Sequence, residues 1–323
     1  MIWPFDASDG TPIEALWLVL YLVSFALHAV FVSYVAAGTV YALVAAVRRS
    51  ADPIAERARD WLPFMLGAGI TAGVGPLLFL QLLYQRRFYT ANLLMGPRWG
   101  AVVPALILGF YALYLAKASE RRRRLALGIG AVCFAFVAWS WTELHQVMLD
   151  DPGWRAMYGA GERFHLEVAI VPRLVTWAGA MLALFATLAA WPANAPERRR
   201  LAALALAGLA TCGATSAVVL AIGREVDRAH GWSHVLAAAG IAAALGWGWT
   251  GRRPDGPGLR VATAATAAAL LAGAVVREAP RLALIEHARQ TAVGAGGLPV
   301  FVATLAVGIA AIAWTLRTVR GAA

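Results

Sequence analysis

Residues 19–35, VLYLVSFALHAVFVSYV, decide the fold class of this chain. They contain no Asp, Glu, Lys or Arg and belong to a longer apolar run over residues 14–47. A bilayer hydrocarbon core is about 30 Å thick, and a helix of about 20 apolar residues crosses it. Residues 14–47 therefore predict a transmembrane helix with length to spare.

The composition of the whole chain agrees with a membrane location. Of 323 residues, 60% are hydrophobic and 14% are charged, whereas soluble domains have about 25% charged residues. The 28 Lys and Arg exceed the 18 Asp and Glu. They lie between apolar runs, which is typical of topology signals and not of a nucleic-acid surface. Cys133 and Cys212 lie inside apolar runs without CxxC spacing, which argues against a disulfide framework, a zinc site and covalently attached haem.

Nine apolar runs have the length of a span, and every connection between them is short. We therefore expect an all-α integral membrane protein with one transmembrane domain over residues 1–323. Similar ends on the even-numbered spans predict two four-helix units, 14–148 and 167–276, and a ninth helix. The N-terminal segment has no basic region or small-residue cleavage site, so no cleaved signal peptide is expected. The predicted spans are 14–47, 61–84, 99–117, 124–148, 167–191, 200–222, 231–250, 259–276 and 299–316.

The distribution of basic residues predicts the orientation. One set of alternate connections holds 17 Lys and Arg, the other set holds 10, and Arg173 lies within a span. Because cytoplasmic loops carry the basic excess, the richer set is placed inside. The N-terminus is then outside and the C-terminus cytoplasmic. The predicted cytoplasmic segments are 48–60, 117–124, 197–200, 251–260 and the C-terminal tail.

On this topology all six histidines lie in the outer half of the membrane or on its outer surface. Two interpretations are open: these histidines bind haem iron or another metal, or they are hydrated side chains at the membrane interface. The second interpretation is favoured for His230 and His287. The others are His28, His145, His165 and His234.

His28 stands apart because it lies in the middle of an apolar run, where an ionisable group is costly and usually marks a site. Tyr21, Ser24 and His28 share one helix face by their i, i+3, i+7 spacing. We expect this face to look into the bundle and His28 to bind haem iron. A hydrogen bond from His28 to a carbonyl of a neighbouring helix is the alternative.

Two further patterns allow two interpretations each. His230 and His234, at i and i+4, suit one metal ion or two separate ligands, and a zinc ion would need Glu225 or Asp227 nearby. Small residues in the second span let another helix backbone or a flat macrocycle approach closely. These residues are Gly67, Gly69, Gly73 and Gly75.

Arginine and glutamate recur at the predicted outer helix ends, near Glu143, in residues 223–225 and in residues 276–281. They form interfacial ion pairs, or their arginines neutralise haem propionates, because guanidinium binds carboxylates through two parallel hydrogen bonds. Arg224 and Arg277 are the predicted propionate partners.

Three segments resemble subunit I of the cytochrome bd quinol oxidases. The first span, with His28 before VFVS, looks like that family's first helix, whose histidine binds a haem b. RDWLPFMLGAGITAGVG (59–75) and FLQLLYQ (79–85) are similar to its glycine-rich second helix. HQVMLDDPGW (145–154) looks like the segment after its fourth helix. The resemblance implies nine spans, an outer N-terminus and haem near the outer face.

The sequence also departs from that family. RLVTW (173–177) offers no second haem-ligating histidine, and GWSHVLAA (231–238) lacks the family's methionine and has His234 instead. The third span lacks the family's glutamates, and the outer loop that carries quinol oxidation is reduced to about eight residues. Arg277 resembles the arginine of a further family motif. Reduction of oxygen is therefore not the leading expectation.

These observations predict a membrane haem-b subunit of a respiratory complex. It would move electrons between membrane quinone and a c-type cytochrome or iron–sulfur subunit at the outer face. His28 is the predicted ligand of one haem, with His145 or His234 as the second ligand. Ala- and Arg-rich usage with a single lysine is typical of a high-GC bacterium, so the bacterial inner membrane is the expected location. The alternatives are a cofactor-free anchor subunit, a bd-type oxygen-reducing subunit and, from Pro172 and Arg173, a transporter.

Overall fold

The computed structural model describes residues 12–160, 168, 170–222, 230–282 and 284–285, together with isolated residues between 302 and 317. All regular elements within these ranges are helices. The chain divides into two units, residues 1–285 and 286–323. Every helix named below belongs to the first unit. Their bounds are α1 Pro12–Val47, α2 Pro53–Leu83, α3 Gln85–Leu94, α4 Gly96–Gly100, α5 Val102–Ala118, α6 Arg123–Leu149, α7 Asp151–Ala160, α8 Ile170–Ala190, α9 Ala195–Ile222, α10 His230–Arg252 and α11 Gly258–Leu282.

Seven of the described helical segments are long and apolar enough to cross a membrane. They are α1, α2, α4 together with α5, α6, α8, α9 and α11, and they coincide with seven predicted spans. Within the described residues the prediction of an all-α fold is confirmed, and these seven helices have the length and composition expected of a multi-pass membrane protein. α10 covers an eighth predicted span and has 23 residues, but it is not among these seven. Most of the ninth span, 299–316, lies outside the described residues, so nine spans and their orientation stay predictions.

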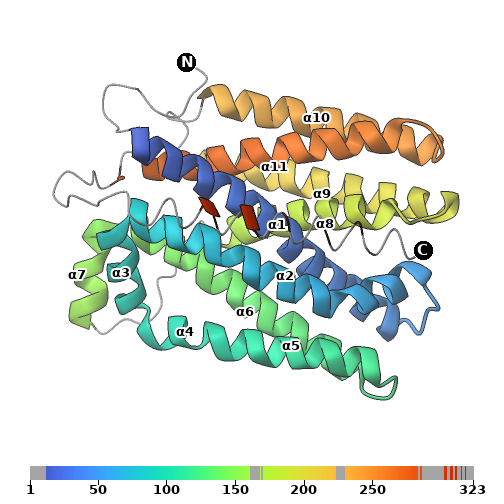
Figure 1. The fold of residues 1–323 in the computed structure, drawn as a ribbon, viewed down its shortest axis with the longest axis horizontal. Coiled ribbons are helices and arrows are strands. Elements are labelled where there is room, and N and C mark those ends of the chain that lie inside the picture. The colour runs from blue at the N-terminus through green and yellow to red at the C-terminus, as the bar shows by residue number, and fades with distance from the viewer. Residues whose placement is uncertain are drawn as a thin grey trace. The chain divides into compact units, whose positions relative to one another are not determined.

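Consecutive long helices pair as α1–α2, α5–α6, α8–α9 and α10–α11, and α1 also packs against α8 and α6 (Figure 1). Buried side chains form two clusters. The larger one surrounds Leu62, Phe185 and Trp247, and the smaller one surrounds Leu18 and Tyr84. Because α1 contributes residues to both clusters, it connects them along its length.

α2 begins two turns earlier than the apolar run predicts. Asp52 caps the helix by accepting a hydrogen bond from the Ile54 amide at 2.9 Å, and Pro53 takes the first helical position, where no amide donor is needed. Asp52 also accepts from the Tyr41 hydroxyl at 2.8 Å and pairs with Arg200 at 3.2 Å. This carboxylate therefore ties α1, α2 and α9 together. The prediction of a start at residue 61 was too late because charged residues of the first turns do not count in an apolar window.

Three short helices, α3, α4 and α7, occupy segments that the sequence predicts as outer loops, 85–98 and 149–166. Arg87 of α3 pairs with Asp151 of α7 and donates to the Met148 carbonyl at 3.0 Å. Trp154 of α7 donates from its ring nitrogen to the Val147 carbonyl at 2.6 Å. These contacts hold α3 and α7 against the end of α6.

Candidate functional site

His28 lies where α1 packs against α2. Its Nδ1 is 2.8 Å from the carbonyl oxygen of Gly69. Because a carbonyl only accepts hydrogen bonds, Nδ1 carries the proton and donates, and Nε2 keeps its lone pair. Within the described residues Nε2 has no hydrogen-bond partner. The half-buried His28 ring is thus fixed through one nitrogen and leaves the other available.

Two glycines of α2 make room for the α1 side chains. A Cβ atom on Gly73 would lie 2.9 Å from Nδ1 and Cε1 of His28, and one on Gly75 would lie 3.1 Å from Cβ of Ser24. A methyl group at Gly73 would therefore displace the His28 ring, and one at Gly75 would press on the Ser24 side chain. A Cβ atom on Gly67, by contrast, would meet nothing within 4 Å. Of the two interpretations of these glycines, the structure shows close packing of α2 against α1.

The shared face of Tyr21, Ser24 and His28 points into the bundle, as their spacing predicts. Tyr21 is buried, and the other two contact glycines of α2. An α-helix rises 1.5 Å per residue, so Tyr21 lies about 10 Å along α1 from His28. This face leads from His28 to a group of buried charges around Tyr21.

We call these five residues the Glu278 cluster: Glu278, Arg281, Arg277, Tyr21 and Tyr84. Arg281 forms an ion pair with Glu278, and its Nη2 donates to the Tyr21 hydroxyl at 2.9 Å. The Tyr84 hydroxyl donates to Oε1 of Glu278 at 2.6 Å, and Arg277 donates to the Tyr21 hydroxyl at 3.2 Å. The cluster joins α1 and α11 with the residue that ends α2.

The Glu278 cluster holds two arginines and one glutamate, so it carries a net positive charge. Glu278 and Arg281 are each 1% exposed. The Tyr84 side chain is fully buried as well, and its hydroxyl is the donor to Oε1 of Glu278. Such buried charges are costly unless they are paired, and the single carboxylate of Glu278 pairs with Arg281 and, at 3.8 Å, with Arg277. The excess charge gives the cluster the capacity to bind a carboxylate.

Arg277 is the more accessible arginine of the cluster. Its guanidinium lies 4.7 Å from the centre of the Phe25 ring and 5.9 Å from that of Trp177. Cations are attracted to aromatic faces at these distances. The two rings therefore orient Arg277 between α1 and α8.

His145 of α6 borders the Glu278 cluster. It is 5% exposed, and neither ring nitrogen has a hydrogen-bond partner within the described residues. Met148, three residues further along α6, accepts a hydrogen bond from Arg281 at its sulfur atom, over 3.8 Å. A buried polar atom without a partner costs about 1–3 kcal/mol, so the His145 ring calls for a partner from outside the described residues, such as water or a ligand.

A second buried ion pair involves Glu143, which lies on α6 as His145 does. Arg98 of α4 pairs with Glu143 through both carboxylate oxygens, and the Trp139 ring nitrogen donates to Glu143 at 2.8 Å. Two interpretations of the segment near Glu143 followed from the sequence, an interfacial ion pair and a functional role. The structure shows the ion pair.

The other predicted site residues lie elsewhere or outside the described residues. His234 is an exposed side chain on α10, and within the described residues no hydrogen bond or ion pair joins it to the Glu278 cluster. His230 begins α10, but its side chain is outside the described set. Arg224, His165 and His287 also lie outside the described residues, as do Glu225 and Asp227 of the zinc alternative. In the described part of the chain, no three His, Cys, Asp or Glu gather as a metal site.

Sequence reasoning missed Tyr84 and Arg98 as partners of buried carboxylates. Each follows or precedes an apolar run, where tyrosine and arginine ordinarily mark the membrane interface. Their partners lie far away in the sequence, so nothing local distinguishes them.

No model of a known protein family matches this chain, and no curated protein matches it. The resemblance to cytochrome bd subunit I therefore stays an expectation from the quoted segments.

Proposed function

We propose that the chain is a membrane haem-b subunit of a respiratory electron-transfer complex. It moves electrons between membrane quinone and a c-type cytochrome or iron–sulfur subunit at the outer face of a bacterial inner membrane. The arrangement of His28 carries this proposal. Ligating histidines almost always donate their other ring N–H to a carboxylate, water or backbone carbonyl, as His28 does to Gly69.

The neighbouring residues suit the other parts of a haem. His28 binds the iron through Nε2, and the orphaned nitrogens of His145 make it the candidate for a second ligand. Arg277 and Arg281 bind propionate carboxylates, and Glu278 balances part of their charge. Bound haem supplies a one-electron carrier whose potential depends on ligation and burial.

A cofactor-free anchor subunit is the second candidate function. It is favoured by the same hydrogen bond, because a histidine that donates to Gly69 is also satisfied without iron. A bd-type oxidase subunit is the third possibility that the resemblance raises.

One spectrum separates the first two candidates. The full chain is purified from haem-producing cells, and its reduced-minus-oxidised spectrum and pyridine haemochrome are recorded. Haem b bound to the chain supports the proposal, and its absence rejects it in favour of the anchor. Quinol oxidation with and without a c-type cytochrome, followed together with oxygen consumption, then distinguishes electron transfer to a partner from oxygen reduction.

Gly73→Ala is expected to lower haem content or haem affinity by about tenfold, as loss of a supporting contact does at metal sites. The new methyl group displaces the His28 ring from its position on Gly69. Gly67→Ala is the matched control, because it makes the same change in the same helix with open space around the methyl group. Equal haem content in both variants would contradict the assignment of His28.

A further inference from the structure

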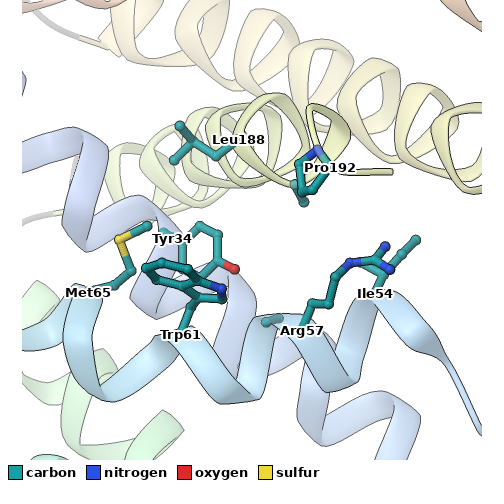
Figure 2. Close-up of a pocket in the computed structure, with 9 residues that line it drawn as sticks. Tyr34, Ile54, Arg57, Trp61, Met65, Leu188 and Pro192 are labelled. Atoms are coloured by element: carbon teal, nitrogen blue, oxygen red, sulfur yellow. The ribbon is translucent and has the colours of Figure 1, made fainter. Parts of the chain in front are cut away.

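A cavity of about 270 Å³ lies between α1, α2 and the end of α8. None of its lining residues belongs to the Glu278 cluster. Figure 2 shows Leu188 and Pro192 on one side and Trp61 and Arg57 on the other. Three of its lining residues, Ile54, Arg57 and Ala58, belong to the predicted cytoplasmic connection 48–60, and Pro192 lies close to the next one, 197–200.

The cavity offers hydrogen-bond donors. Tyr34 is held edge-on against Phe185, with ring centres 5.3 Å apart, and its hydroxyl has no partner within the described residues. Arg57 donates from Nη2 to Glu197 at 2.6 Å, and no other hydrogen bond of its guanidinium is present in the described helices. A ligand in this cavity can accept from the Tyr34 hydroxyl and from the remaining Arg57 N–H groups.

The cavity offers no acidic acceptor. No Asp or Glu lines it, and Glu197 is engaged by Arg57 and by the Asn194 amide at 3.0 Å. The ion pair with Glu197 also balances the Arg57 charge. Without an acidic residue in its lining, the cavity disfavours an ammonium headgroup. Because Glu197 neutralises Arg57, the cavity also has no excess positive charge to bind an anionic headgroup. A neutral group with acceptor oxygens fits best.

The volume and the apolar lining of the cavity restrict the ligand further. Pockets for drug-sized ligands have about 300–1,000 Å³, so this cavity of about 270 Å³ admits little more than one substituted ring. Met65 and Leu188 provide apolar walls, and Trp61, which is 54% exposed, lies beside it. A ring inside and an apolar tail in the surrounding lipid satisfy these constraints.

We propose that this cavity binds the headgroup of a lipid-soluble quinone. The ring carbonyls accept hydrogen bonds from Tyr34 and Arg57, and the tail extends into the bilayer. Tyr34 is six residues from His28, about 9 Å along α1. This inference deepens the proposed function, on which it rests for any electron transfer, whereas binding itself requires no haem.

The test measures binding of decylubiquinone and of a short-tailed naphthoquinone to the purified full chain by quenching of tryptophan fluorescence. Tyr34→Phe is expected to weaken binding about fivefold, the effect of one lost hydrogen bond. Leu188→Trp fills the cavity and is expected to abolish binding. Tyr41→Phe is the control, because Tyr41 also lies on α1 against Phe185 but does not line the cavity.

Wild-type affinity in both Tyr34→Phe and Leu188→Trp would overturn the proposal. So would displacement of the quinone by phosphatidylglycerol but not by phosphatidylcholine, which would indicate a site for an anionic lipid headgroup. His28→Ala separates this proposal from the previous one. Quinone binding without haem leaves the cavity assignment standing, and haem without quinone binding leaves only the haem assignment.

Discussion

The purified His28→Ala variant is expected to contain no measurable haem b at the α1 site, with haem content reduced by well over the roughly tenfold expected for a supporting residue. Alanine removes Nε2, the nitrogen left available when Nδ1 donates to Gly69. The measurement is the pyridine haemochrome per mole of purified chain, together with the reduced-minus-oxidised spectrum. If more than one haem is bound, the spectrum loses one component.

Ser24→Ala is the matched control for this variant. Ser24 lies one turn from His28 on the same face, and its hydroxyl donates to the Leu20 carbonyl of its own helix at 2.6 Å. Wild-type haem content is expected there. Full haem content in His28→Ala would contradict the assignment of His28 as a ligand. Equal loss of haem in both variants would indicate that the substitutions disturb the α1–α2 contact. His145→Ala and His234→Ala then identify the second ligand, and the buried His145 is expected to matter more.

Glu278→Ala is expected to lower the free energy of unfolding by about 3–5 kcal/mol, the cost of breaking a buried ion pair. Arg281 would keep its charge in a buried position without its carboxylate, and the Tyr84 hydroxyl would lose its acceptor. The measurement is thermal unfolding of the purified chain in detergent, with the change in apparent Tm compared across variants.

Asp255→Ala is the control, because Asp255 pairs with Arg198 at 3.5 Å with most of its side chain exposed. Exposed pairs contribute about 0–1 kcal/mol. The double variant Glu278→Leu/Arg281→Met is expected to recover much of the loss, since apolar residues replace buried pairs well. If Glu278→Ala lowers the apparent Tm no more than Asp255→Ala does, the ion pair does not stabilise the charges of the Glu278 cluster. Hydration of the cluster would then be the explanation.

The helices were predictable from sequence because a span is a local property. Residues 124–148 and 259–276 read as apolar runs and are helical over Arg123–Leu149 and Gly258–Leu282. The same criterion was too strict at charged helix ends, as at the start of α2, and it missed α3 and α7, which are not continuously apolar. The ends of helices depend on caps and on contacts that a hydropathy window does not register.

The candidate site was predictable in part. The position of His28 in an apolar run and its shared face with Tyr21 are readable from spacing. The partners are not, because Tyr84 and Glu278 lie 194 residues apart and meet only through packing of the bundle. Pairings of this kind require three-dimensional proximity that one sequence does not reveal.

The separation between Tyr84 and Glu278 also has a consequence for biogenesis. During synthesis the α1–α2 hairpin, with His28 already against Gly69, is complete long before α11 leaves the ribosome. Tyr21 and Tyr84 are then without the charged partners that they later bind. The Glu278 cluster can therefore form only after α11 has been synthesised, and a chain that ends before residue 258 lacks the charged partners of Tyr21 and Tyr84.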